Sequence, residues 1–210
     1  MTTNSKCKIC RRAGVKLFLK GEKCFSPKCP MVRKPYPPGP KGKRRPRGLS
    51  EYGKELKEKQ KLKNWYNLEE RQFENYVKKV LGKRGKVEDA GTLLIKNLES
   101  RLDNVVFRLG LASSRKAARQ LVSHRHILVN NRPVSIPSFQ VKKGDTIKIH
   151  PSSLNKNIFQ NLSQVIKKYK APSWLSLDAK TLEGKVVGSP TSEEAAPPAE
   201  VASVFEFYSK

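Results

Sequence analysis

The sequence has 210 residues, and its 44 Lys and Arg against 18 Asp and Glu give a formal net charge of +26. Apolar residues make up 37% of the chain, enough for one or two modest cores, so a fully disordered polycation is not expected. No run of about 18 apolar residues is present, and the first residues lead into cysteines, so we expect neither a membrane span nor a signal peptide. This excess of positive charge suits a polyanionic partner, nucleic acid first and an anionic membrane surface second.

The positive charge is unevenly distributed along the chain. Residues 1–50 hold 15 basic and 1 acidic side chains, and residues 101–150 hold 10 and 2. Residues 51–100 hold 12 and 9, and residues 151–210 hold 7 and 6. This pattern indicates two RNA-facing basic modules on either side of a balanced, helical middle.

The elements of the first half can be predicted from local signals. Residues 34–48 (KPYPPGPKGKRRPRG) are too rich in Pro and Gly for a helix or central strand, which predicts an extended basic arm. Ser50 can cap a helix from Glu51 towards Trp65. Asn67 begins a capping-box pattern for a second helix, whose apolar stripe ends before Gly82.

The next segment predicts a small α+β module. A third helix with a continuous apolar stripe is expected from residue 92 to Leu109, with Gly110 as its stop. A fourth, shorter helix starts at Ser113 or Ser114 and carries basic residues on its outer side. After His126 the pattern changes to short strands, expected at 127–129, 133–134, 139–141 and 146–149.

The four cysteines, Cys7, Cys10, Cys24 and Cys29, lie within the first 29 residues. Two closely spaced pairs separated by a loop can bring four sulfur atoms to one tetrahedral point, which favours a structural zinc ion. An iron–sulfur cluster is the second interpretation, and two disulfides or free thiols are the third. Four thiolates leave no open coordination position, so we expect no metal catalysis.

No enzyme signature is present in the sequence. The phosphate-binding, dinucleotide-binding and HExxH motifs are absent. His124 and His126 are two residues apart, so they cannot share a helix face as a metal pair, and we interpret them as packing or RNA-surface residues. No nucleophile with an adjacent base can be identified, which predicts a protein that is not an enzyme.

The RNA-binding prediction rests on the fourth helix and the hairpin that follows it. Basic side chains one helical turn apart can follow phosphates, and an Arg guanidinium can also stack on bases. The mechanism we expect is recognition of the backbone and shape of folded RNA. The predicted RNA-binding residues are Arg115, Lys116, Arg119, Arg125, Asn131 and Arg132.

Three segments of this module resemble a known family. RLDNVVFRLG at 101–110, SRKAARQLVSH at 114–124 and ILVN at 127–130 resemble the small RNA-binding fold named after ribosomal protein S-four. That fold is also an appendage of pseudouridine synthases, some tRNA synthetases and stress proteins. The flanking segments LSEYGKELKEKQKL at 49–62 and EFYSK at 206–210 look like the ribosomal protein family itself.

The resemblance implies a bacterial-type primary binder of small-subunit rRNA in the cytoplasm, which nucleates assembly of the subunit body. Its implied neighbours are ribosomal proteins S-five and S-twelve, and the S-five interface is implied to influence decoding accuracy. Arg44, Arg45 and Arg47 match the arm that is implied to approach mRNA at the entry tunnel. The four cysteines match the metal-bearing version of the family. No homo-oligomer is expected.

The resemblance also implies a discontinuous domain organisation. The C-terminal segment would pack on the N-terminal helical domain, which fits the apolar residues Phe205, Phe207 and Tyr208 near the end of the chain. The predicted architecture is therefore α+β. It has a zinc-bearing helical domain of residues 1–90 with 171–210, and a small RNA-binding domain of two helices and short strands, residues 91–170.

Two other functions remain open on the sequence alone. An RNA-modifying enzyme could use the small module to dock, although the remainder of the chain is short for a catalytic domain. A zinc-finger DNA regulator would need a recognition helix and would prefer duplex DNA.

Overall fold

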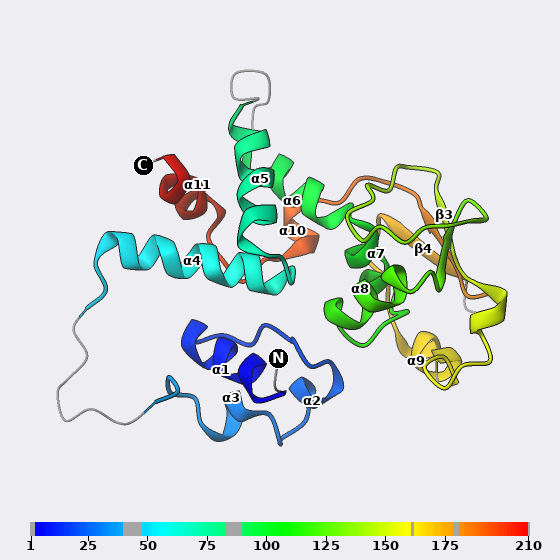
Figure 1. Cartoon of the computed structure of the whole chain (residues 1–210), viewed down its shortest axis with the longest axis horizontal. Coiled ribbons are helices and arrows are strands. Elements are labelled where there is room, and N and C mark those ends of the chain that lie inside the picture. The colour runs from blue at the N-terminus through cyan, green and yellow to red at the C-terminus, as the bar shows by residue number, and fades with distance from the viewer. Residues whose placement is uncertain (1–2, 40–47, 83–89, 161, 179–180, 210) are drawn as a thin grey trace. The chain divides into compact units, whose positions relative to one another are not determined.

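The computed structural model describes residues 3–39, 48–82, 90–160, 162–178 and 181–209 (Figure 1). The chain forms two compact units, one of Met1–Gly91 with Ala196–Lys210 and the other of Thr92–Ala195. The sequence had assigned all of 171–210 to the N-terminal domain. Residues 171–195 belong instead to the second unit, because two strands within them complete its sheet. None of the described helices is long and apolar enough to cross a membrane.

The first unit is built from helices. Its N-terminal part carries three helices that no sequence signal predicted, and its central part carries two helices that were predicted. The C-terminal residues add one more. In chain order these are α1 (Thr3–Ala13), α2 (Glu22–Phe25), α3 (Pro30–Arg33), α4 (Glu51–Trp65), α5 (Glu70–Leu81) and α11 (Val201–Ser209).

The ends of α4 and α5 follow from their capping residues. The Ser50 hydroxyl accepts a hydrogen bond from the Gly53 backbone N–H at 3.2 Å, so the predicted cap of α4 is confirmed. The predicted cap of α5 is wrong. Asn67 adopts a left-handed turn conformation with φ of 55°, and the helix starts two residues later, with Glu69 at the N-cap position. Gly82 ends α5, as predicted.

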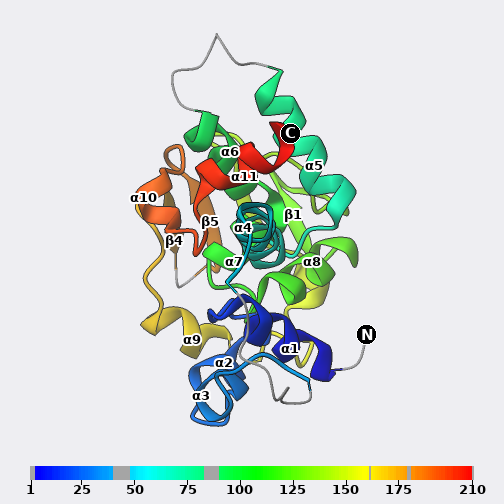
Figure 2. The same cartoon turned by 90° about the vertical axis from the view of Figure 1, so that its left-hand side faces the viewer.

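The C-terminal helix α11 packs on α4 and α5, as Figures 1 and 2 both show. Val204 and Phe205 are buried, and the Phe207 ring lies 5.4 Å from that of Tyr52. The Tyr208 hydroxyl donates to Glu70 Oε1 at 2.9 Å. The predicted docking of the apolar C-terminus is therefore confirmed.

The second unit contains an antiparallel sheet with the strand order β2-β1-β3-β5-β4. Strands β1 and β3 match the prediction, while β4 and β5 were missed. The expected strand at 139–141 is wrong, because the described residues there form only an isolated bridge between Arg101 and Gln140. The strands are β1 (Ile127–Val129), β2 (Arg132–Pro133), β3 (Thr146–Ile149), β4 (Leu175–Asp178) and β5 (Glu183–Val186).

Helices pack with this sheet around a shared apolar core. The core side chains of α7 and α8, among them Val106 and Leu121, are buried with those of the strands, including Ile127 and Ile147. The longer helices are α6 (Ala90–Glu99), α7 (Leu102–Arg108), α8 (Arg115–Ser123) and α9 (Leu162–Lys168). The short elements are a 3-10 turn, η1 (Pro151–Ser153), and α10 (Ser192–Ala195) within the predicted loop 189–200.

The predicted third helix is broken into α6 and α7. Arg101 has an extended backbone conformation at the break, with φ of −69° and ψ of 137°. Its guanidinium is buried against the Asp103 carboxylate at 2.9 Å. A continuous helix would place these two side chains differently, so the buried ion pair goes with the break in the helix. The apolar stripe continues across this break and therefore does not predict it. Gly110, with φ of 76°, ends α7 as predicted.

Candidate RNA-binding surface and cysteine cluster

Helix α8 presents a basic outer side because its inner side is fixed in the core. The Ser114 hydroxyl caps the helix by accepting from the Ala117 backbone N–H at 3.3 Å. Ala118 and Leu121 are buried on the inner side. Lys116 is exposed and Arg119, which was also predicted to bind RNA, is half-buried.

Arg115 differs from these predicted partners because its side chain is only 7% exposed. Its Nε donates to Asn104 Oδ1 at 2.8 Å, and its guanidinium lies 4.6 Å from the centre of the Phe107 ring. Its Nη2 is 4.0 Å from the Glu99 carboxylate. The prediction that Arg115 contacts RNA is therefore corrected: this arginine holds α8 to the core.

Glu99 is the centre of this buried polar network. Its carboxylate accepts two hydrogen bonds from Arg108, each 2.9 Å long, and a third from Asn104 Nδ2 at 2.7 Å. The Glu99 side chain is only 1% exposed, so its charge needs the two neighbouring arginines for compensation. The network joins α6 and α7 to the first turn of α8, and thereby supports the basic helix.

The remaining predicted contacts lie in the turns that follow α8 and at the start of β2. Arg125, Asn131 and Arg132 are exposed. Asn130 and Asn131 have φ of 49° and 64°, the left-handed conformations required by a two-residue turn between β1 and β2. The Asn130 amide donates to Asp145 Oδ1 at 2.8 Å, which holds this turn in place.

The three histidines of the chain come together where β1 begins and β3 ends. The rings of His124 and His126 are 6.0 Å apart, and the His150 backbone N–H donates to the His126 carbonyl at 2.9 Å. Burial lowers the pKa of His126, and the positive charge of Lys156 and the other two histidines lowers it further. The sequence could not reveal this cluster, because the register of β1 against β3 brings His150 to the other two.

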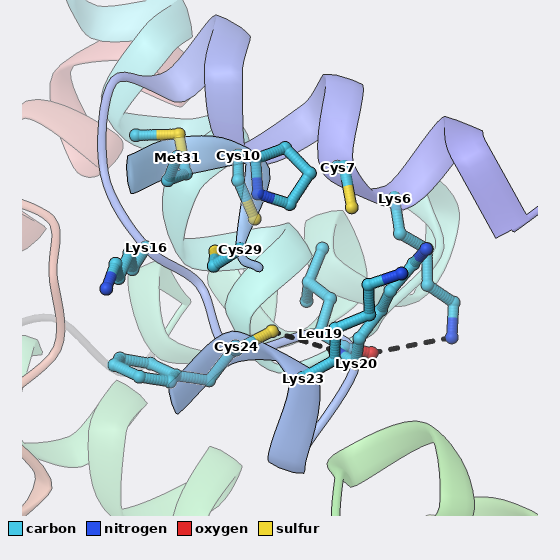
Figure 3. Close-up of a pocket in the computed structure, with 12 residues that line it drawn as sticks. Lys6, Cys7, Cys10, Lys16, Leu19, Lys20, Lys23, Cys24, Cys29 and Met31 are labelled. Carbon is cyan, nitrogen blue, oxygen red and sulfur yellow. Dashed lines mark hydrogen bonds between the residues drawn. The ribbon is translucent and has the colours of Figure 1, made fainter. Parts of the chain in front are cut away.

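The four cysteines line one small pocket, and their sulfur atoms are directed into it (Figure 3). None of them forms a disulfide. Burial raises the pKa of the Cys10 and Cys24 thiols, and the charges of neighbouring cysteines raise it further. The Lys20 backbone N–H donates to Cys24 Sγ at 3.4 Å.

The structure does not establish a metal centre here. Among the described residues, no group of three or more His, Cys, Asp or Glu side chains is arranged so that it could hold a metal ion. The four cysteines line the same pocket, but their sulfur atoms are not arranged in a coordination geometry. Zinc therefore stays a prediction. The predicted arm residues Arg44, Arg45 and Arg47 lie outside the described residues.

Comparison with known proteins assigns two successive parts of the chain to known domain families. Residues 1–99 match the family model described as "Ribosomal protein S4/S9 N-terminal domain", and residues 100–147 match the "S4 domain". A small ribosomal subunit protein uS4 of Thermus thermophilus is 48% identical over 204 residues, which cover 97% of this chain and 96% of the relative. The uS4 protein of Kosmotoga olearia is 47% identical over 208 residues, covering 99% and 98%.

The fold and these matches define a ribosomal protein with an RNA-binding domain of the S4 type. More particularly, the chain belongs to the uS4 family of small ribosomal subunit proteins. This family is structural, so the prediction that the protein is not an enzyme is confirmed, and an RNA-modifying enzyme is not favoured.

Proposed function

We propose that this protein is built into the small ribosomal subunit in the cytoplasm, where it binds rRNA directly and nucleates folding of the subunit body. The observation that carries the proposal is the basic surface formed by α8 and the hairpin after it. Its members are Lys116, Arg119, Arg125, Asn131 and Arg132. Membership of the uS4 family supports the choice of small-subunit rRNA as the partner.

The geometry favours recognition of RNA shape and backbone. Lys116 and Arg119 are three residues apart on α8, so their side chains leave the same side of the helix. Side chains at this spacing can contact successive phosphates without reading bases. Asn131 can donate and accept hydrogen bonds at the hairpin tip, which suits contacts to ribose or a splayed base.

Zinc is our proposal for the cysteine cluster, with Cys7, Cys10, Cys24 and Cys29 as its ligands. Four soft sulfur donors around one pocket suit zinc in tetrahedral coordination. Burial and mutual repulsion oppose the thiolate form of Cys10 and Cys24. Zinc held by these four sulfur atoms would compensate this repulsion and would join the helices α1, α2 and α3. An iron–sulfur cluster is the less favoured occupant.

The finer roles rest on the family resemblance. We propose that Arg44, Arg45 and Arg47 contact mRNA or rRNA at the entry tunnel, because they are part of a Pro-rich basic segment. The proposed neighbours are ribosomal proteins S-five and S-twelve, with an effect on decoding accuracy through S-five.

A salt-titrated binding competition tests the proposed function. The full chain is offered small-subunit rRNA fragments, unrelated structured RNA and duplex DNA at increasing salt concentration. Preference for one rRNA region that persists at moderate salt supports the proposal, since non-specific phosphate contacts weaken steeply with salt. Equal binding to all three, abolished by salt, contradicts it.

Matched double variants locate the surface. Lys116→Ala with Arg119→Ala should reduce the slope of log K against log salt by about 1 to 2, because up to two phosphate contacts are lost. Lys54→Ala with Lys79→Ala removes the same charge from exposed positions on α4 and α5. A smaller change for the second pair is expected. Equal loss for both pairs would show that only net charge matters.

A further inference from the structure

The three histidines gather at the edge of the proposed RNA-binding surface. His124 follows α8, His126 precedes β1, and His150 follows β3, so three different elements supply them. The rings of His124 and His126 face each other at 24° between their planes. His126 also lies beside the exposed Arg125, whose left-handed backbone, with φ of 59°, turns the chain from helix to strand.

The groups around His126 come from several neighbouring elements. His124 acts on it from the end of α8 and His150 from the end of β3, while Lys156 acts from the segment after η1. The Ser153 hydroxyl is 2.8 Å from His126 Nδ1, and the Phe159 ring meets the His126 ring edge to face. The charges that act on His126 are thus all basic.

The hydrogen bonds hold the rings in defined orientations. His150 Nδ1 accepts the Ser152 backbone N–H at 3.3 Å and lies 2.7 Å from its hydroxyl. The proton of the neutral His150 ring is therefore on Nε2. An anion that approaches the Nε2 side of the His150 ring meets an N–H donor, and a proton on the neighbouring His126 ring would increase the attraction.

We infer that His124, His126 and His150 form a proton-linked phosphate subsite, at which an RNA phosphate binds most tightly when at least one ring is protonated. The inference rests on the proposed function, because the phosphate is supplied by the rRNA. In the free protein, burial and the neighbouring positive charges oppose protonation of His126. A phosphate reverses that balance, so RNA binding takes up a proton.

The sign of the linkage follows directly. If RNA binding raises the pKa of a histidine, the complex binds more protons than the separated partners, and affinity falls as pH rises through that range. One linked histidine gives at most a tenfold loss of affinity per pH unit. Several-fold weaker binding at pH 7.5 than at pH 6 is therefore expected.

The test measures affinity of the full chain for its preferred small-subunit rRNA fragment between pH 5.5 and 8.5 at constant salt. His124→Gln with His126→Gln should bind like the wild type at pH 8.5 and lose most of the increase towards low pH. Lys116→Gln is the matched control, because lysine stays charged over this range. Its affinity should fall by the same factor at every pH.

A second measurement follows the imidazole protons by NMR. The chain has three histidines, so each can be assigned by substitution and titrated with and without the rRNA fragment. A higher pKa of His126 in the complex is expected. An unchanged His126 titration, or a pH dependence that the double variant retains, would overturn the inference.

The outcomes separate this inference from the proposed function. Selective rRNA binding with a flat pH profile refutes the proton-linked subsite alone. Absence of rRNA preference at every pH refutes the proposed function itself. Thermal melts of the variants exclude unfolding as the cause, and His124→Gln alone, at an exposed position, provides a substitution that leaves the fold undisturbed.

Discussion

Removal of the buried charge of Glu99 tests whether the polar network supports α8. In the Glu99→Gln variant the side chain keeps nearly the same shape, but Arg108 and Arg115 then face a neutral amide. Glu99 is 1% exposed and receives hydrogen bonds from Arg108 and Asn104 at 2.7 to 2.9 Å. Removing one partner of a buried ion pair costs about 3 to 5 kcal/mol, because the other charges remain buried without compensation.

The lower end of that range is expected here. The Arg108 side chain is 17% exposed, so water can solvate part of its charge after the substitution. Arg115 is more deeply buried and 4.0 Å from Glu99, and its remaining bond to Asn104 is preserved. We therefore expect a loss of about 3 kcal/mol in the free energy of unfolding of the second unit.

Urea unfolding followed by fluorescence measures this loss. Trp174 is buried in the core of the second unit, and Trp65 lies in the first, so a Trp65→Phe background leaves Trp174 as the only reporter. The control is Glu183→Gln, which breaks the half-exposed pair with Lys148 and should cost less than about 1 kcal/mol. A Glu99→Gln loss as small as that of the control would refute the assigned role of the network.

The Glu70 carboxylate has a pKa of about 2 despite the opposing effect of burial, because it accepts hydrogen bonds from two lysines and Tyr208. This pKa is below the 4.5 of an unperturbed Glu, so the ionised Glu70 stabilises the fold fully above pH 4.5, and this stabilisation is lost as the pH falls towards 2. Because the Glu70 side chain is 44% exposed, we expect a contribution of about 1 kcal/mol to the free energy of unfolding. The measurement compares the urea stability of the wild type with that of Glu70→Gln at pH 6 and at pH 3. Gly110→Ala should cost about 1 to 2 kcal/mol in thermal or urea unfolding, because φ is +76° and the new Cβ would lie 2.8 Å from the Tyr169 ring; an unchanged midpoint would contradict this. Metal analysis of purified protein should find one zinc per chain, reduced in Cys24→Ser, and a strong chelator should lower the melting temperature of the wild type more than that of the variant.

Local signals in the sequence were reliable where one residue decides the geometry. Ser50 and Ser114 cap helices because their hydroxyls reach backbone N–H groups three residues later. The paired Asn residues at 130 and 131 form the turn of the hairpin because they tolerate positive φ. These interactions involve only neighbours in the chain, so the sequence contains all the information they need.

Elements that depend on distant partners were not predictable in the same way. Strands β4 and β5 have only four residues each, and β5 contains Gly184 at a strand position. They are strands because β5 pairs with β3, whose paired residues lie 37 to 39 positions earlier in the chain. The break between α6 and α7 also depends on a distant partner, because the backbone of Arg101 forms an isolated β-bridge with Gln140. The sequence around residue 101 does not contain this information.

In the candidate RNA-binding surface, too, local signals placed the helix but did not separate buried charged side chains from accessible ones. Composition and spacing located the basic helix, but they assigned Arg115 and Arg119 the same role. Burial separates them, because the core contains the Glu99 carboxylate and the first turn of α8 is the part that can reach it. Part of the positive charge of the chain is therefore used internally, by Arg101 with Asp103 and by Arg108 with Glu99.

This division has a consequence for RNA binding. Arginines paired inside the core cannot release counterions from RNA, so they should not contribute to the salt dependence of affinity. Their substitution should weaken binding only through loss of the structure that orients α8. A steep salt slope that persists in Glu99→Gln, at a reduced affinity, would distinguish the supporting residues from those that touch phosphates.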